Sequence, residues 1–121
     1  MHKVLVIDDD ELVLKLMKDA LEEEMYQVLA TADGPQGITI FKQQRPDLVL
    51  LDLGLPSMGG IEVLKEIRSF DSKARVIVVS GYSTSESVAA AIRYGAWDSV
   101  EKSLELDELL TKIRAALQSV Q

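Results

Sequence analysis

The sequence contains no cysteine and a single histidine. Without cysteine the chain can form neither a disulfide bond nor a thiolate metal site, and it has no cysteine nucleophile. Its apolar runs are short, and none approaches the roughly 18 consecutive residues that a membrane-spanning helix requires. Acidic residues begin at Asp8, which argues against a secretory signal peptide. We therefore expect a cytoplasmic protein without a membrane-spanning helix.

Positive charge is also scarce. The chain has 13 Lys and Arg residues against 20 Asp and Glu, a formal net charge of -7, and the basic residues are scattered. An acidic protein repels phosphate backbones, so direct binding to nucleic acid is not expected, and no basic amphipathic helix predicts membrane binding. The 121 residues are 47% hydrophobic and 27% charged. This predicts one domain over residues 1–121 that can bury a core.

Short apolar runs alternate with longer amphipathic segments along the whole chain. The runs cover residues 4–7, 28–30, 48–51, 76–79 and, more weakly, 97–100. The first, third and fourth runs are continuous and rich in Val, Leu and Ile, which is typical of strands buried on both faces of a parallel sheet. Right-handed crossovers would place helices on both faces of such a sheet. We therefore predict five β-α units in an α/β, doubly wound fold.

The segments between these runs have the spacing of amphipathic helices. The apolar residues that carry this spacing are Val13, Leu16, Met17, Ala20 and Leu21, then Ile61, Leu64 and Ile67, and finally Leu106, Leu109, Leu110, Ile113 and Leu117. An Asp-Gly-Pro sequence at residues 33–35 predicts the start of the second helix. Ser83 to Glu86 has the spacing of a capping box, and Gly95 can end that helix.

Carboxylates stand at the expected C-terminal ends of two strands. Asp8 and Asp9 follow the first strand, and Asp52 follows the third apolar run. In open parallel sheets, ligands bind beyond these ends. Three carboxylates at one edge repel each other, so a bound cation would stabilise them at neutral pH. Oxygen ligands suit Mg²⁺, which would also neutralise phosphoryl oxygens.

A simpler interpretation of residues 8–10 is that they only cap the first helix, because Asp is favoured at helix N-termini. The carboxylate at a second strand end, Asp52, favours the metal site instead. For Asp10 and Glu11 we do predict capping or a favourable interaction with the helix dipole. These two residues are therefore not placed in the site.

Asp52 closes an almost wholly apolar stretch, so its carboxylate should be functional or paired. A carboxylate can accept a phosphoryl group and form an acyl phosphate. The alternative is an Asp in a solvent-exposed turn. The glycines that follow predict a tight loop, in which Gly54 could offer its backbone carbonyl to a metal.

Two further residues at strand ends complete the predicted site. Ser80, beside Gly81, could donate a hydrogen bond to a phosphoryl oxygen, and Lys102 could bring positive charge to the same oxygens. Taken alone, a serine at a strand end or a surface lysine indicates little. Their occurrence together with the carboxylates, at four separate strand ends, predicts a phosphoryl-transfer site.

With these residues in place, the sequence resembles the receiver domains of two-component response regulators over essentially its full length. The matching stretches are VLVIDDD at residues 4–10, PDLVLLDLGLP at 46–56, Gly59 and Gly60, VIVVSG at 76–81, Gly95-Ala96, and Lys102 followed by LDELL at 106–110. Each stretch is weak by itself, but their order and spacing together are highly specific.

The resemblance implies a flavodoxin-like, five-stranded parallel sheet in the order 2-1-3-4-5. It implies a phosphorylation switch in which Asp52 accepts a phosphoryl group from a sensor histidine kinase or a histidine phosphotransfer protein, assisted by Ser80 and Lys102. Mg²⁺, or Mn²⁺ in its place, would be bound by Asp9, Asp52 and the Gly54 carbonyl, and by Asp8 through water. Such a domain assists its own phosphorylation without being a dedicated enzyme.

The resemblance also implies an output surface. In the family, phosphorylation changes the face made by the fourth helix, the fifth strand and the fifth helix. That face would contact the downstream effector, whose identity the sequence does not indicate, and would form a homodimer. The physical requirement is that the phosphoryl group, with about two negative charges, makes different contacts in the two states of the domain.

Two positions depart from the family pattern. Ser103 follows Lys102 where the family usually has proline, often after a cis peptide bond. A cis bond before another residue costs about 2.5–4 kcal/mol, and we expect packing of the loop to maintain it here. Ser99 stands where the family usually has an aromatic residue that moves with the hydroxyl residue, so phosphoryl acceptance is a firmer expectation than the usual coupling.

Three other classes of protein fit the sequence less well. An aspartyl-phosphate phosphatase would need a second acid two residues after Asp52, where this chain has Gly54. A nucleotide-binding module would need a G-x-G-x-x-G or G-x-x-x-x-G-K-[ST] loop, and neither occurs. A pseudo-receiver, which binds proteins without being phosphorylated, remains the alternative. Its only support is the departures at Ser99 and Ser103.

Overall fold

Strands and helices alternate along the chain in the computed structural model, which describes residues 1–55, 58–81, 85–102 and 106–118. The strands are β1 (Lys3–Ile7), β2 (Gln27–Thr31), β3 (Leu48–Asp52), β4 (Val76–Ser80) and β5 (Asp98–Glu101). The helices are α1 (Glu11–Glu23), α2 (Gly34–Gln44), α3 (Gly60–Phe70), α4 (Ser85–Arg93) and α5 (Leu106–Gln118). The five predicted β-α units are confirmed.

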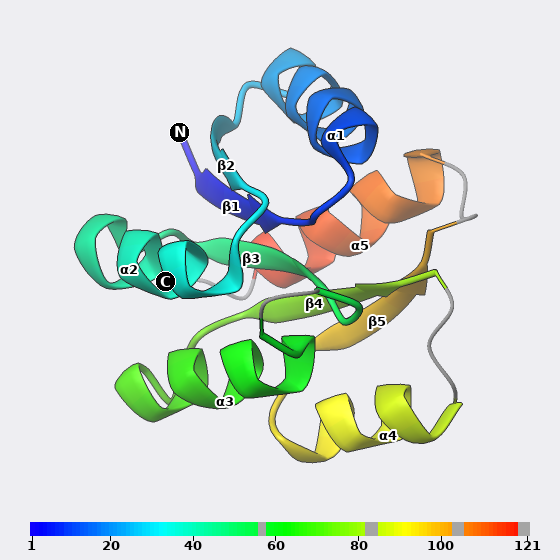
Figure 1. Ribbon diagram of the computed structural model, residues 1–121. Helices are drawn as coiled ribbons and strands as arrows, with labels where there is room; N and C mark the ends of the chain where they lie inside the picture. The colour runs from blue at the N-terminus through cyan, green and yellow to red at the C-terminus, as the bar shows by residue number, and fades with distance from the viewer. Residues whose placement is uncertain (56–57, 82–84, 103–105, 119–121) are drawn as a thin grey trace.

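The strands form one parallel sheet in the order β2-β1-β3-β4-β5 (Figure 1). The chain first adds β2 on one side of β1 and then crosses to β3 on the other side. This reversal of direction places the carboxyl ends of β1 and β3 at the switch point of the sheet. The α/β, doubly wound, flavodoxin-like fold is therefore confirmed, including the strand order.

Two apolar clusters cover the two faces of the sheet. One contains alternate residues of the central strands with residues of α2, α3 and α4, including Ile7, Leu51 and Leu64. The other contains the remaining strand positions with residues of α1 and α5, including Leu50 and Ile113. In Figure 1, α1 and α5 accordingly lie on the opposite side of the sheet from α2, α3 and α4. Since β3 is buried on both faces, its side chains are apolar up to its last residue.

The helix boundaries follow local chemistry that the sequence shows. Asp10 is the N-cap of α1, and its side chain accepts hydrogen bonds from the backbone N–H groups of Leu12 and Val13. Asp33 caps α2 in the same way through Gln36. Gly95 follows α4 with a φ of 102°, a left-handed conformation that favours glycine. The capping box predicted to begin at Ser83 lies outside the described residues.

The helical spacing assigned two leucines to the apolar faces of their helices, but the structure shows that both are exposed. Leu16 of α1 is 59% exposed and Leu106 of α5 is 49% exposed. Leu14 and Met17, rather than Leu16, pack with Leu21 against the cluster beneath α1. A run rich in apolar residues fits more than one helical face, and the packing against the sheet selects between them.

No described helix is long and apolar enough to cross a bilayer.

Gly60, the first residue of α3, allows this helix to approach the end of β3 closely. Its backbone N–H donates to the carbonyl of Leu53 at 3.2 Å. A Cβ atom at this position would lie 2.5 Å from the Cα of Leu53 and 2.6 Å from the carbonyl oxygen of Asp52. Both neighbours are backbone atoms and cannot rotate away, so only glycine fits here. Gly60 thereby positions the loop that directly follows Asp52.

Replacing Gly60 with Ala should displace this loop and lower the free energy of unfolding by about 1–3 kcal/mol, the usual effect of overpacking. Gly59 is a matched control, because a Cβ there would meet no atom within 4 Å and its φ is −59°. At Gly59 a weaker N-cap and a stiffer unfolded chain oppose each other, so Gly59→Ala should change stability by less than about 0.5 kcal/mol. Urea unfolding measures both, and equal losses would refute the role assigned to Gly60.

Candidate functional site

The register of the sheet brings the predicted residues to one edge. Ile7 of β1 pairs with Leu51 of β3, so Asp8 and Asp52 follow as neighbours at the ends of these strands. On the other side, β4 ends at Ser80, which pairs with the last residue of β5, and Lys102 comes next. The ends of β1, β3, β4 and β5, where the predicted residues stand, thus lie along one edge of the sheet.

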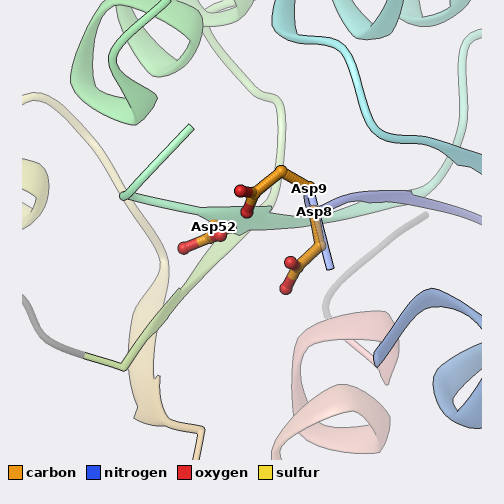
Figure 2. Close-up of side chains that lie close together, drawn as sticks. All are labelled: Asp8, Asp9 and Asp52. Carbon is orange, nitrogen blue, oxygen red and sulfur yellow. The ribbon is translucent and has the colours of Figure 1, made fainter. Parts of the chain in front are cut away.

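Asp8, Asp9 and Asp52 form a cluster of carboxylates at this edge (Figure 2). One oxygen of each lies within 4.8 Å of the others. Asp8 is 1% exposed and Asp52 is 4% exposed, whereas Asp9 is exposed. These three side chains form the only group of potential metal ligands that the described part of the chain contains. Two of its three charges are thus withdrawn from water.

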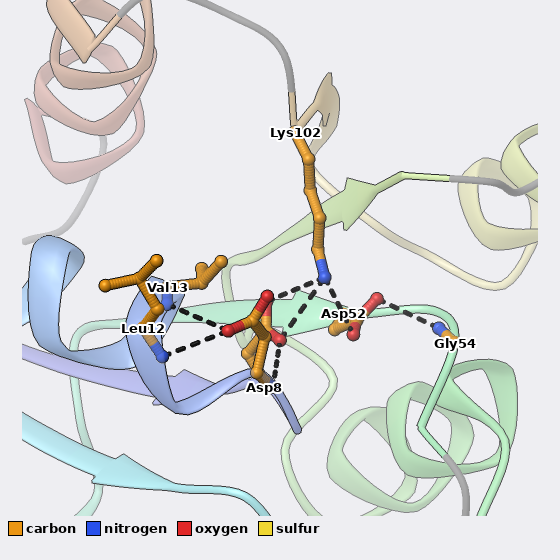
Figure 3. Close-up of polar contacts among 7 residues, drawn as sticks. Asp8, Leu12, Val13, Asp52, Gly54 and Lys102 are labelled. Carbon is orange, nitrogen blue, oxygen red and sulfur yellow. Dashed lines mark hydrogen bonds and ion pairs between the residues drawn. The ribbon is translucent and has the colours of Figure 1, made fainter.

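Lys102 places its ammonium group against the two buried carboxylates (Figure 3). Its Nζ lies 3.2 Å from Oδ2 of Asp8 and 3.2 Å from Oδ2 of Asp52. The lysine extends from the end of β5, and its side chain is 26% exposed. When all four groups are ionised, one ammonium faces three carboxylates, so two negative charges remain uncompensated at this edge.

Backbone N–H groups orient the buried carboxylates. The N–H of Asp10 donates to Oδ1 of Asp8 at 2.9 Å. The N–H of Gly54 donates to Oδ1 of Asp52 at 3.0 Å (Figure 3). One carboxylate oxygen of Asp52 therefore accepts a hydrogen bond from the backbone of Gly54, and the other accepts one from Lys102. Such contacts fix the side chain before any ligand arrives, which is the condition for precise alignment.

Two residues of the site, Asp8 and Lys102, have shifted pKa values. Burial raises the pKa of Asp8, and repulsion from Asp52 adds to this effect, while the hydrogen bond from Asp10 and the charge of Lys102 oppose it. For Lys102, burial acts to lower the pKa, but the hydrogen bond to Asp52 and the attraction of both carboxylates outweigh it and raise the pKa. Ionised Asp8 is therefore disfavoured by folding, and charged Lys102 is favoured.

Replacing Asp8 with Asn should raise the free energy of unfolding of the metal-free protein at pH 7. Because the pKa of Asp8 is raised by folding, the wild type loses stability as the pH rises through the titration of this group. The advantage of the variant should therefore shrink as the pH falls into the range where carboxylates take up protons. Urea unfolding in EDTA across that range measures it.

Asp9→Asn is the control for this prediction, because it removes the same charge from an exposed carboxylate of the cluster. We expect its effect on stability to be smaller. An equal gain in both variants would show that general charge repulsion, rather than burial of Asp8, sets the stability.

Two of the sequence predictions at this edge concern residues outside the described part of the chain. The backbone of Ser80 lies at the predicted strand end, but its side chain is outside the description, as are Ser103 and the peptide bond before it. Ser99 lies in β5 and is half-buried. Its carbonyl accepts a hydrogen bond from Nζ of Lys112 in α5 at 3.0 Å, so a lysine side chain joins α5 to the backbone of β5 at this position.

Sequence reasoning did not find the ion pairs of Lys102 with Asp8 or the close approach of Gly60. The contact of Lys102 joins residues 94 positions apart, and no spacing in the sequence indicates such a pair. Gly60 did show a signal, since two adjacent glycines precede an apolar helix. Which of the two meets the backbone of β3 is decided by the packing of α3.

Comparisons of the sequence with known protein families and proteins give matches over most of the chain. The sequence model described as "Response regulator receiver domain" matches residues 4–114. The chain is 36% identical to chemotaxis protein CheY of Bacillus subtilis over 117 residues, which cover 96% of this chain and 98% of that protein. It is 39% identical to the transcriptional regulatory protein KdpE of Mycobacterium tuberculosis over 118 residues, and there it spans only 52% of the relative's length.

A solved structure gives the same result. The crystal structure of a CheY-like receiver domain protein from Methanospirillum hungatei superimposes with a TM-score of 0.94 at 30% sequence identity, and the match covers 98% of this chain and 94% of that one. The family match over residues 4–114 and the similarity to CheY over 96% of the chain identify the family. This chain belongs to the receiver domains of two-component response regulators.

Proposed function

We propose that this chain is a phosphorylation switch in which Asp52 accepts the phosphoryl group. The observation that carries the proposal is the placement of Asp52: a nearly buried carboxylate at the end of β3, with Lys102 Nζ at 3.2 Å and two further carboxylates beside it. A buried carboxylate oriented by one N–H and one ammonium is a nucleophile held in a defined direction.

The reaction we propose is transfer from a phosphohistidine of a sensor histidine kinase or a histidine phosphotransfer protein. A carboxylate oxygen of Asp52 attacks phosphorus, an O–P bond forms, and the P–N bond breaks, so that the imidazole leaves with the electron pair. Lys102 lies close enough to follow the charge from the carboxylate to the new phosphoryl oxygens. Ser80 would donate a hydrogen bond to one of them. Since the domain is itself the acceptor, we do not class it as a dedicated enzyme.

The three carboxylates fit a divalent metal ion. Their oxygens are hard ligands, they converge within 4.8 Å, and they leave negative charge that Lys102 does not neutralise. We propose that Asp9, Asp52 and the carbonyl of Gly54 would hold Mg²⁺ or Mn²⁺ directly, with Asp8 acting through water. A bound ion of this kind neutralises charge on the transferring phosphoryl group.

The output side of the proposal concerns α4, β5 and α5. Lys102 directly follows β5, and Lys112 of α5 contacts both the carbonyl of Ser99 and, at 3.6 Å, the carboxylate of Asp98. Because Lys102 is adjacent to β5 in the sequence, a change in its contacts can shift this strand. The contacts of Lys112 would then pass the shift to α5. We propose that phosphorylation alters this face of a cytoplasmic protein, and that the face binds an effector or a second copy.

Replacing Asp52 with Asn should abolish phosphorylation by a phosphohistidine or small acyl-phosphate donor. The amide lacks the nucleophilic oxygen pair, and the wild type should react only with Mg²⁺ present. Intact-mass spectrometry detects the added phosphoryl group. The control is Asp19→Asn, an exposed carboxylate of α1, which should react as the wild type does.

A beryllofluoride titration followed by amide NMR shifts complements this test. Shifts around Asp9 and Lys102 that are absent in Asp52→Asn would establish the acceptor site, and their spread over residues 85–102 and 106–118 would show whether the switch operates with Ser99 in β5. Absence of both mass change and shifts in the wild type would overturn the proposal and favour the pseudo-receiver alternative.

Replacing Lys102 with Met should strengthen Mg²⁺ binding and weaken phosphorylation. The ammonium at 3.2 Å from Asp8 and Asp52 competes with the metal for the same carboxylates, so its removal should lower the Kd on the order of tenfold, equivalent to about 1.4 kcal/mol. The phosphorylated fraction should fall, because the phosphoryl oxygens lose a cation. NMR titration with Mg²⁺ and mass spectrometry measure the two effects.

The matched control is Lys112→Met, which removes the same charge from a lysine that pairs with Asp98. Its Mg²⁺ affinity should stay close to that of the wild type. If Lys102→Met bound Mg²⁺ no more tightly than Lys112→Met, the ammonium would not be a competitor at the site.

A further inference from the structure

A shallow pocket of about 410 Å³ lies between the C-terminal end of α3 and the chain that follows α4. Its lining residues are Lys65, Arg68, Ser69, Ser72 and Tyr94. In Figure 1 both helices run in the same direction, opposite to the strands, so these ends lie at the edge of the sheet away from Asp52. The pocket is therefore separate from the carboxylate site and takes no part in phosphoryl transfer.

Two cations give this pocket the opposite charge to the protein as a whole. Lys65 places its Nζ 4.2 Å from the centroid of the Tyr94 ring. Within the part of the chain that the structure describes, neither Lys65 nor Arg68 forms an ion pair with a carboxylate. In a chain with a net charge of -7, two adjacent cations without a carboxylate partner form a local positive region.

The guanidinium of Arg68 is held in place before any ligand binds. Its Nη1 donates to the carbonyl of Ala74 at 3.0 Å. The group also packs against Gly95, where a Cβ atom would lie 2.6 Å from Nε of the arginine. A guanidinium carries five N–H donors in a rigid fork that matches the oxygens of a carboxylate or phosphate. Because the side chain is already ordered, binding would cost it less conformational entropy.

We propose that this pocket binds a small molecule that carries phosphate or carboxylate groups. Arg68 supplies the fork, Lys65 supplies a second positive charge, and the hydroxyl groups of Ser69 and Ser72 supply neutral donors. The volume lies within the range of roughly 300–1,000 Å³ in which proteins bind small molecules. Because only five residues line the shallow pocket, a compact anion can reach both cations and both hydroxyl groups.

The test is an NMR titration of the intact chain with inorganic phosphate and, separately, with citrate, at constant ionic strength and without Mg²⁺. Both should cause saturable amide shifts at Arg68, Ser69, Ser72 and Tyr94, and chloride should not. Saturation by only one anion would identify its chemical group as the one recognised. Omitting Mg²⁺ keeps anions away from the Asp52 edge, where uncompensated carboxylates repel them.

Lys65→Gln should raise the Kd for the bound anion at least about fivefold, since it removes one charge-assisted contact, and Lys65→Arg should restore binding. Lys42→Gln is the matched control. Lys42 also lies over an aromatic ring, 5.5 Å from the centroid of Phe70, but outside the pocket, so the same loss of charge there should change the Kd less than twofold.

Two results would overturn the proposal. Shifts that grow linearly with anion concentration, or that are confined to the residues around Asp9 and Lys102, would show that the pocket does not bind anions. Equal losses of affinity in Lys65→Gln and Lys42→Gln would show that anion binding depends only on the net charge of the protein. Arg68 would then serve only to stabilise the negative C-terminal end of α3, where it is the basic residue of the last turn.

Discussion

The repulsion between carboxylates withdrawn from water is the constraint on which the rest of this structure depends. Asp8 and Asp52 are nearly inaccessible, and with Asp9 they converge within 4.8 Å. Left alone, such charges would repel each other across the edge of the sheet. Lys102 counters them by an ion pair to each buried carboxylate, and the N–H groups of Asp10 and Gly54 hold their other oxygens. These contacts hold the two side chains in place, but part of the negative charge at the edge stays uncompensated, which favours a bound cation.

This arrangement links stability to function. Because burial raises the pKa of Asp8, ionised Asp8 is disfavoured in the folded state, whereas charged Lys102 is favoured. The apolar clusters on the two faces of β3 contribute free energy that offsets the cost of burying the Asp8 charge. The same negative charge would favour the divalent cation proposed above. Lys102 pairs with both buried carboxylates in this structure, and in the proposed function it would contact the phosphoryl oxygens after transfer.

The topology of the sheet separates this chemistry from the opposite edge. Strand ends carry the carboxylates, whereas the cations Lys65 and Arg68 lie on α3, beside Tyr94 of the chain that follows α4. The two regions have opposite charge and lie at opposite ends of the central strands (Figure 1). The proposed anion site and the proposed metal site therefore do not overlap. The distance between them also means that any effect of one on the other would have to pass through the packed helices and strands.

The sequence by itself determined the five β-α units, the caps at Asp10 and Asp33, and the residues that stand at strand ends, because continuous apolar runs and capping residues act locally. Tertiary structure decided which partners these residues contact. The burial of Leu14 instead of Leu16 depends on how α1 lies on the sheet. The ion pair of Lys102 joins two ends of the chain that only strand order brings together. The basic pocket likewise arises where two helices end side by side, and no local pattern specifies such a meeting.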